Sequence, residues 1–398
     1  MSLAIDAVVA GHICLDICPD LNSMERVAFE KAFLPGRLIA AGPAAFSTGG
    51  AVSNTGLAMN RLGIPVRLSA KIGADLFGQA ILHILAAQGP RLADGIIVDP
   101  SASTSYTILI NYPGVDRIFL HSPGANDIYS AGDVPYADLE QARLFHFGYP
   151  PIMRSMYLRD GDSLVSMFQR SKNTGVTTSL DMAFPDPSSP AGKVDWRRLL
   201  SRTLPWVDFF FPSVEEILFM LRRETYERMS AAGGGTGGIL AQVTPELLSS
   251  LGKELLGMGA RVVVLKLGER GLYLRTGAQS EIDGLGKAYP IHLEAWSQCE
   301  YWAPCFAARV AGTTGAGDAT IAGLLSAVLR GFSPQAALTA AVAVGACCVE
   351  AADALSGIRT WDATMERIQG GWQRQPLTLR ASGWQLDQAS GVWRGPCS

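Results

Sequence analysis

The sequence lacks a long basic run and any strong excess of one charge. Its 33 lysines and arginines stand against 36 aspartates and glutamates, which gives a formal net charge of -3 at pH 7. Proteins that bind nucleic acid generally carry a basic patch or stripe. The composition therefore argues against nucleic acid as a partner. A substrate that carries phosphate would have to be bound by helix dipoles and a few cationic side chains.

Long apolar runs are also missing. The best candidate, residues 336–349, is too short to cross a bilayer and is typical of a buried helix. The first residues include Asp6 and are typical of a strand, whereas a secretory leader combines positive charge with an apolar run. We therefore expect no signal peptide, no membrane association and a cytoplasmic location.

Metal-ligating patterns of cysteine and histidine are absent. The seven cysteines show no C-x-x-C spacing, and the five histidines are dispersed. The first strand-like run is not followed by Gly-x-Gly-x-x-Gly, the motif of dinucleotide-binding folds. These absences disfavour zinc proteins and nicotinamide-dependent oxidoreductases, and they predict buried, reduced thiols.

Strand-like and helix-like runs alternate along most of the chain. The strand-like runs are 7–10, 66–71, 95–98, 144–147, 176–181, 207–211 and 261–266. The helix-like runs lie near 78–87, 154–171, 214–223, 245–258, 319–330 and 336–349. This alternation predicts an α/β fold with a mostly parallel sheet and helices on both of its faces. Ligands of such sheets bind beyond the carboxyl ends of the strands.

The most informative motif is Thr-Thr-Gly-Ala-Gly-Asp at 313–318, directly before a helical pattern. A helix start exposes unpaired backbone N–H groups and the positive end of the dipole, and glycines let an anion approach them. Asp318 would stand beside that anion site, where it could remove a proton from a hydroxyl that attacks a phosphate. Taken alone, an aspartate in this place more often only helps to start a helix.

A second glycine-rich motif, Gly-Gly-Ala-Val-Ser-Asn at 49–54, precedes a short helical run that stops at Gly63. Together the two motifs resemble the paired signatures of the ribokinase-like (PfkB) carbohydrate kinases, and the resemblance extends over about 8–353. It implies an α/β, ribokinase-like three-layer sandwich, with a mostly parallel central sheet and a small β lid over the sugar.

The resemblance assigns the chemistry to the later motif. Asp318 is expected to be the general base, because a carboxylate can accept the hydroxyl proton as the oxygen–phosphorus bond forms. The N–H groups of Gly315, Ala316 and Gly317 are expected to hold the γ-phosphoryl oxygens as negative charge builds.

The earlier motif is expected to form the floor of the sugar site. Asp16 follows the first strand, and a carboxylate can accept hydrogen bonds from neighbouring hydroxyls of a sugar. Gly49 and Gly50 permit close backbone approach, and the amide of Asn54 offers a donor and an acceptor. The alternative for these three residues is a turn followed by a helix cap.

Nucleotide and metal residues are implied by the same resemblance. Lys266 and Gly268 follow a strand in the place of the family's nucleotide loop, and Thr314 is expected to bind the cofactor as well. Glu216 keeps the place of the glutamate that organises magnesium. Ser213 replaces the family's usual asparagine, and Ser213 with Glu216 is also the pattern of a capping box.

A second departure from the family lies at Gly312. The family usually has an aspartate here, which in related enzymes helps to bind an activating monovalent cation. Its absence removes one hard oxygen ligand. We therefore predict weak or absent activation by potassium.

The resemblance also predicts the domain organisation. Residues 1–375 are expected to form the kinase domain, with a lid from about 16–45 and 104–122, although 104–122 could also be an ordinary edge hairpin. Residues 376–398 are expected to form a C-terminal tail, and 285–306 is an addition to a minimal family member. A homodimer through the lid is plausible, because exposed strand edges would otherwise remain unpaired.

We therefore expect an enzyme that uses ATP and Mg²⁺ to phosphorylate a hydroxyl of a small sugar or sugar-like polyol. A nucleoside or inositol kinase of the same fold is an alternative. Because Ser213 and Gly312 depart from the family's pattern, a third interpretation is a sugar-binding protein whose kinase site has lost its activity.

Overall fold

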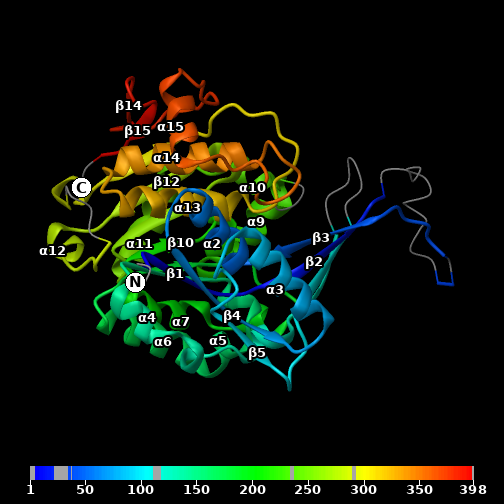
Figure 1. The fold of residues 1–398 in the computed structure, drawn as a ribbon. Coiled ribbons are helices and arrows are strands. Elements are labelled where there is room, and N and C mark those ends of the chain that lie inside the picture. The colour runs from blue at the N-terminus through cyan, green and yellow to red at the C-terminus, as the bar shows by residue number, and fades with distance from the viewer. Residues whose placement is uncertain are drawn as a thin grey trace.

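A twisted sheet of eleven strands runs through the centre of the computed structural model, and helices cover both of its faces (Figure 1). The structure describes residues 5–21, 35–36, 38–110, 118–233, 237–288 and 293–396. The strand order is β14-β15-β13-β12-β11-β10-β9-β8-β1-β4-β5.

Seven neighbouring strands of this sheet are parallel. From one edge they are β5 (Ile96–Asp99), β4 (Val66–Gly73), β1 (Ala7–Gly11), β8 (Leu144–Gly148), β9 (Thr177–Asp181), β10 (Phe209–Phe211) and β11 (Val262–Lys266). Antiparallel strands then extend the sheet: β12 (Leu272–Thr276), β13 (Glu300–Ala303), β15 (Val392–Arg394) and β14 (Gln385–Asp387). The predicted α/β class with a mostly parallel sheet is confirmed.

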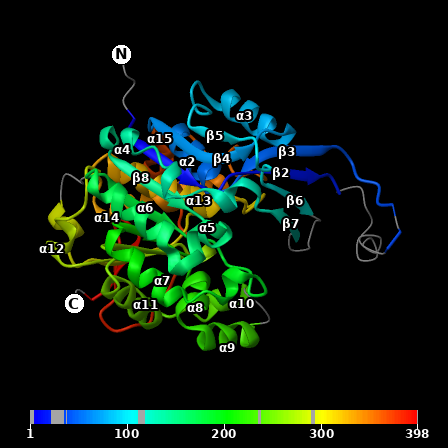
Figure 2. The same ribbon diagram turned by 90° about the horizontal axis from the view of Figure 1, so that it is seen from below.

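Two hydrophobic cores lie on the two faces of the sheet, because both faces of a parallel sheet are covered and its strands are apolar on both sides. Ala7 and Val9 point into one core, and Val8 and Ala10 point into the other. The first core is closed by α2 (Ala51–Arg61), α3 (Leu76–Gln88), α13 (Ala316–Leu329), α14 (Pro334–Cys348) and α15 (Trp361–Gln369). The second is closed by α4 (Tyr136–Gln141), α6 (Asp162–Asn173), α7 (Trp196–Thr203), α8 (Val214–Leu221) and α11 (Pro245–Gly257), which face the viewer in Figure 2.

A separate sheet of four strands projects from one side of the molecule (Figure 1). Its order is β3 (Ala44–Gly49), β2 (Cys14–Pro19), β6 (Tyr106–Ile110) and β7 (Ile118–Ser122). This is the small sheet of the predicted lid. The remainder of the segment 16–45 lies partly outside the described residues, and the predicted turn at 113–114 lies wholly outside them.

One predicted helix, 154–171, is wrong as a single element. The chain forms α5 (Arg154–Tyr157), a turn and then α6. Arg159, Asp160 and Gly161 have positive φ angles of 51°, 52° and 78°. Right-handed helix cannot continue through such residues, so the apolar periodicity of this stretch spans two helices.

The last residues of the chain belong to the main sheet. β15 pairs with β13, and β14 pairs with β15, so that 376–398 is built onto the sheet edge and does not form a separate tail in its described part. The addition at 285–306 likewise contributes β13 and the buried Trp296, whose ring contacts Phe209 edge-on. In the described part of the chain no helix combines the length and hydropathy needed to cross a bilayer.

Candidate active site

Several loops at the carboxyl ends of the parallel strands meet the first turns of α2 and α13. His12, after β1, accepts a hydrogen bond at its backbone oxygen from the N–H of Val52 in α2. The N–H of Tyr149, after β8, donates to the backbone oxygen of Asp181 at the end of β9. This is the edge at which ligands of open α/β sheets bind.

Asp318 lies at the centre of this edge, in the first turn of α13, and is only 3% exposed. The side-chain amide of Asn54 donates to its Oδ2 at 3.1 Å, and the hydroxyl of Thr55 donates to its Oδ1 at 3.2 Å. The hydroxyl of Tyr149 lies 2.9 Å from Oδ1 and 2.8 Å from Oδ2. Residues from the two glycine-rich motifs, 264 positions apart, are therefore in direct contact.

Burial raises the pKa of Asp318 above its ordinary value. The hydrogen bond from Tyr149, the positive charge of Lys266 and the hydrogen bonds from Asn54 and Thr55 act in the opposite direction. A carboxylate with this balance keeps the basicity needed to accept a hydroxyl proton.

Of the two glycines before Asp318, Gly315 is required by the local geometry, whereas a Cβ on Gly317 would make only ordinary contacts. Gly315 is the N-cap of α13 with φ 71°, and a Cβ there would lie 2.4 Å from the Cβ of Ala354. A Cβ on Gly317 would lie 3.9 Å from the Nζ of Lys266. The ammonium group of Lys266 therefore stands beside the N-terminus of α13, and both attract an anion.

Lys266 is held by an ion pair in this position. Its Nζ lies 2.5 Å from the Oδ1 of Asp181, which is fully buried. Burial lowers the pKa of Lys266, but the carboxylates of Asp181, Glu216 and Asp318 outweigh that effect and raise it. Burial raises the pKa of Asp181, and Lys266 opposes that shift.

Glu216 and Ser213 form the capping box that their spacing indicated. The hydroxyl of Ser213 accepts from the N–H of Glu216 at 3.1 Å, and Oε2 of Glu216 accepts from the N–H of Ser213 at 2.6 Å. Glu216 is 8% exposed and close enough to raise the pKa values of Asp181 and Lys266. One residue therefore caps α8 and adds a carboxylate to the site.

No group of three or more ligating side chains that could hold a metal occurs within the described residues. Magnesium in kinases is nevertheless bound largely by substrate phosphates and water, with one or two carboxylates. Oδ2 of Asp181 is buried without a hydrogen-bond partner among the described atoms. Asp181 and Glu216 thus fit an ion of this kind.

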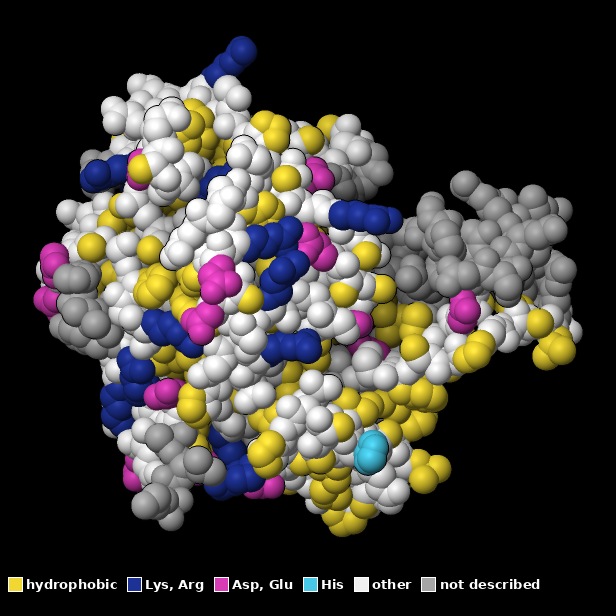
Figure 3. Space-filling view, turned by 45° about the horizontal axis from the view of Figure 1, so that its top comes forward, with side chains coloured by type: hydrophobic (Ala, Val, Ile, Leu, Met, Phe, Trp, Pro, Cys, Tyr) yellow, Lys and Arg dark blue, Asp and Glu magenta, His cyan; other side chains and the backbone are white. Residues whose placement is uncertain are grey.

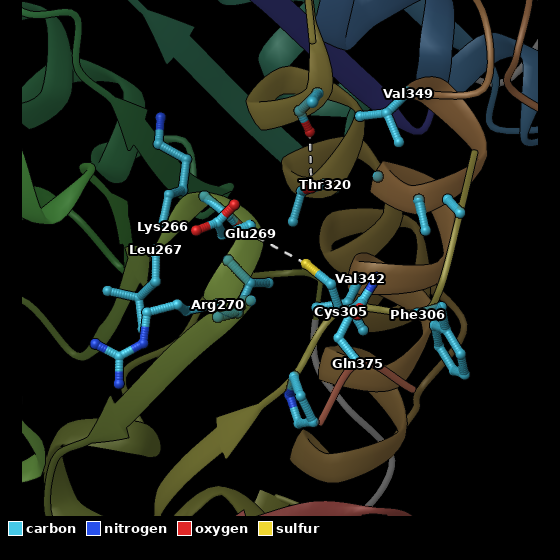
Figure 4. Close-up of a pocket in the computed structure, with 18 of the residues that line it drawn as sticks. Lys266, Leu267, Glu269, Arg270, Cys305, Phe306, Thr320, Val342, Val349 and Gln375 are labelled. Atoms are coloured by element: carbon cyan, nitrogen blue, oxygen red, sulfur yellow. Dashed lines mark hydrogen bonds between the residues drawn. The ribbon is translucent and has the colours of Figure 1, made fainter. Parts of the chain in front are cut away.

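A cavity of about 760 Å³ opens beside Lys266, between the loop after β11 and the helices α13 and α14 (Figure 4). Figure 4 shows Lys266 and Arg270 on one side and Val342, Val349 and Phe306 on the other. Its lining also includes Ala316 and Gly317, which are predicted to bind the phosphate. The cavity therefore runs from the N-terminus of α13 toward an apolar end.

The predicted nucleotide residues take different places around this cavity. Lys266 and Gly268 line it, and Gly268 has the positive φ of 53° that glycine accepts readily. Thr314 does not line it, and its backbone oxygen accepts from the Sγ of Cys348. Thr313, which opens the same motif, and Thr320, which no sequence pattern indicated, line it instead.

The residues predicted to bind the sugar lie on the side of Asp318 away from this cavity. Asp16, in β2, fits against Gly49, because a Cβ on Gly49 would lie 2.2 Å from Oδ2 of Asp16. Gly50 has φ 87°, and a Cβ there would meet Nδ1 of His12 at 2.5 Å. The paired glycines therefore leave room for Asp16 and for His12.

A row of polar residues crosses the face of the small sheet that carries Asp16. Asp16 is paired with Ser47 of β3 and with Thr107 of β6, and Thr107 is paired with His121 of β7. Nε2 of His121 lies 3.4 Å from Nε2 of the buried His12. Hydroxyl, carboxyl and imidazole groups suit the hydroxyls of a polyol.

The position of Gly312 leaves no space for a side chain. A Cβ there would lie 2.8 Å from the backbone oxygen of Ala352. An aspartate could not occupy this position without displacing the backbone. Weak or absent activation by potassium stays a prediction.

Comparison with protein families gives one match over most of the chain. The model of the "pfkB family carbohydrate kinase" matches residues 13–361. The probable chloroplastic fructokinase-6 of Arabidopsis thaliana is 24% identical over 381 residues, which cover 91% of this chain and 82% of that protein. The 2-dehydro-3-deoxygluconokinase of Bacillus subtilis is 24% identical over 322 residues, covering 79% of this chain and 85% of that protein.

Solved structures with the same fold are more distant in sequence. The ribokinase of Arabidopsis thaliana, complexed with ribose and ATP, has a TM-score of 0.65 at 18% identity. The fructokinase of Xylella fastidiosa with bound ATP has a TM-score of 0.66 at 17% identity. In each case 92% of this chain and 98% of the other are covered. This likeness shows that the fold is ribokinase-like.

Proposed function

The chain belongs to the pfkB family of carbohydrate kinases, and from this premise we propose that it transfers the γ-phosphoryl group of ATP to a hydroxyl of a small sugar or sugar-like polyol. The observation that carries the proposal is the position of Asp318. Its carboxylate is bound by Asn54 of the earlier motif and is flanked by Lys266, which lines the neighbouring cavity.

In the proposed reaction, ATP lies in the cavity lined by Lys266 and Gly268. Its γ-phosphate reaches the N–H groups of Gly315 and Gly317 at the start of α13, and that of Ala316 in place of its hydrogen bond to the backbone oxygen of Thr313. The apolar end of the cavity suits the flat face of the adenine.

The sugar is proposed to lie between the polar row of the small sheet and Asp318, with Asp16, Gly49, Gly50 and Asn54 around it. A bond forms between the acceptor oxygen and the γ-phosphorus, and the bond from that phosphorus to the β–γ bridging oxygen breaks. The acceptor proton passes to the carboxylate of Asp318 and then to solvent, and ADP leaves with the electron pair of the broken bond.

Asp181 and Glu216 are proposed to hold Mg²⁺, mostly through water. When bound, the ion neutralises charge on the phosphate oxygens. Lys266 adds a fixed positive charge, and its ion pair with Asp181 keeps it oriented toward Gly317.

The proposal is tested by release of ADP from ATP and magnesium in the presence of a panel of acceptors. The panel contains fructose, ribose, 2-dehydro-3-deoxygluconate, a nucleoside and an inositol, so that it also decides among the acceptor classes. We expect ADP release that depends on at least one acceptor. The proposal would be contradicted if no acceptor of the panel led to ADP release, or if ADP were released at the same rate without an acceptor.

Asp318→Asn tests the assignment of the base. We expect a fall in kcat of about 10²- to 10⁴-fold, with ATP binding retained. Asp195→Asn is the matched control, because Asp195 only caps α7 on the other face of the sheet and asparagine also caps helices. Turnover of Asp318→Asn close to that of the control would contradict the assignment.

We also propose that two copies of the chain pair through the small sheet. Phe46, Ile118 and Leu120 share its apolar face and are 57%, 43% and 53% exposed. Figure 3 shows hydrophobic side chains exposed along this projecting part of the molecule, whereas charges of both signs are interspersed over the main body. Light scattering should give the mass of a dimer, and Phe46→Ser with Leu120→Ser should give that of a monomer.

A further inference from the structure

Tyr149 has an unusual backbone conformation for an aromatic residue. It directly follows β8 with φ 70° and ψ 40°, in the left-handed region that bulky side chains rarely adopt. Such strain persists only where the surroundings impose it, and it is concentrated at functional sites. The position of the side chain therefore calls for an explanation.

Among the described residues, the hydroxyl of Tyr149 hydrogen-bonds to Asp318 alone. It lies 2.9 Å and 2.8 Å from the two carboxylate oxygens, nearer than the donors from Asn54 at 3.1 Å and Thr55 at 3.2 Å. One hydroxyl proton is thus shared between both oxygens. This arrangement fixes the plane of the carboxylate, whereas Asn54 and Thr55 each hold one oxygen.

Tyr149 is also suited to remain a neutral donor. Burial and the negative charges of Asp318 and Asp181 raise its pKa well above the ordinary value. Its ring lies 6.2 Å from that of His12, on the side of the site where the sugar residues stand. The phenol therefore bridges the sugar side of the site and the carboxylate at the start of α13.

We propose that Tyr149 is a positioning residue that keeps the carboxylate of Asp318 ionised and oriented toward the acceptor hydroxyl. This proposal rests on the proposed function, because it assigns to Asp318 the role of base. The acceptor hydroxyl binds beside the phenol, and Tyr149 itself transfers no proton to the substrate.

The charged and titratable groups around Asp318 and Tyr149 come from five places besides α13 and the loop after β8. They are Lys266 of β11, Asp181 of β9, Glu216 of α8, Cys348 of α14 and His12 after β1, whose ring lies near that of Tyr149. None of them changes in Tyr149→Phe. A change in the pH dependence of this variant therefore reports the loss of one hydrogen bond.

The test compares Tyr149→Phe with wild-type enzyme in steady-state kinetics from acidic to alkaline pH. A hydrogen bond to a charged group favours the ionised form, so its loss should move the acidic limb of the kcat profile to higher pH by about one pH unit. We expect kcat at the optimum to fall by about 10- to 100-fold. The KM for ATP should remain unchanged.

Tyr129→Phe is the matched control. Tyr129 is a fully buried tyrosine whose hydroxyl lies 2.9 Å from Oγ of the neutral Ser69. Loss of this hydroxyl should leave the pH profile unchanged, even if it lowers the melting temperature. Tyr149→Asn is a second variant, since asparagine tolerates the left-handed backbone, and it should show the same shift.

An unchanged acidic limb in Tyr149→Phe and Tyr149→Asn would overturn the proposal. So would an equal shift in Tyr129→Phe, because the effect would then be structural. A wild-type chain without kinase activity would instead overturn the proposed function. The two failures are therefore distinguishable.

Discussion

At the scale of single residues, the absence of a side chain at Gly49 is as informative as the side chains around it. A Cβ on Gly49 would lie 2.2 Å from Oδ2 of Asp16 and 2.7 Å from its Oδ1. We predict that Gly49→Ala displaces the carboxylate and raises the KM for the sugar by about tenfold or more. The KM for ATP should not change, since Gly49 does not line the nucleotide cavity.

Gly257→Ala is the control for this experiment. Gly257 lies at the end of α11, and a Cβ there would meet nothing within 4 Å. Gly257→Ala should leave the KM for the sugar and the KM for ATP unchanged. An equal rise of both values in Gly49→Ala would indicate a general distortion and contradict the assigned role.

A second prediction concerns Asp16 and pH. Burial raises the pKa of Asp16 from 3.8 to about 6, and hydrogen bonds from Cys14 and Thr107 lower it only in part. The folded state therefore binds a proton more readily than the unfolded state. Ionisation of Asp16 destabilises the fold as the pH rises from about 4 to 6, and the full destabilisation is present above about pH 6.

Asp16→Asn should therefore raise the melting temperature at neutral pH, and the gain should vanish as the pH is lowered toward about 4. The same variant should lose affinity for the sugar. Thermal melts over this pH range and the KM for the sugar measure both effects. A gain in stability that is independent of pH would contradict the prediction.

The residues that the sequence revealed are those of recurrent motifs. Asp318, Asn54 and Gly49 stand in glycine-rich segments whose spacing has a physical meaning, and the structure brings Asn54 and Asp318 into contact. Tyr149 and His121 have no such signal. Tyr149 directly follows β8 and His121 lies within β7, each as an isolated polar aromatic residue, and only the fold brings it to the candidate site.

At the scale of elements, α8 depends on its cap. The side chains of Ser213 and Glu216 each bond the other's backbone N–H. We predict that Ser213→Ala lowers the free energy of unfolding by about 1 kcal/mol. Ser213→Asn should retain most of the stability, because asparagine is an equally good N-cap.

Denaturant unfolding measures this difference. Because Glu216 also faces Lys266, Ser213→Ala should reduce the affinity for ATP as well, whereas Ser213→Asn should not. Equal stability of the two variants would show that the cap is dispensable.

The sequence predicted the parallel strands of the main sheet and the hairpin of β6 and β7 well, but the antiparallel extension of the main sheet poorly. β1, β4, β8, β9 and β11 are apolar runs that alternate with helices, so their positions followed from the pattern. β13, β14 and β15 have three or four residues each, and they are strands because they pair with the sheet edge. β13 and β15 pair across about 90 residues of chain, and strands as short as β14 and β15 show little alternation, so neither feature gives a local signal.

At the scale of the whole molecule, the C-terminal segment completes both the sheet and the cavity that is proposed to hold ATP. Trp384 contacts the ring of the buried Trp302, Leu379 is buried, and Pro376 and Leu377 line the cavity. Truncation after Gln375 should therefore lower the melting temperature, promote aggregation through the exposed edge of β13 and raise the KM for ATP.

Trp384→Ala separates these effects, because Trp384 packs on the sheet but does not line the cavity. It should lower the free energy of unfolding by about 1–3 kcal/mol and leave the KM for ATP unchanged. A truncated chain with wild-type stability would contradict the prediction.

The polar row of the small sheet has a consequence for how this enzyme could evolve. Asp16, Ser47, Thr107 and His121 each come from a different strand, and their neighbours along those strands point to the opposite, apolar face. If the acceptor lies against this row, as proposed, single substitutions in it should change acceptor preference without altering either core. Insertion or deletion of one residue within a strand would exchange the two faces, so new specificities should arise here by replacement and not by changes in length.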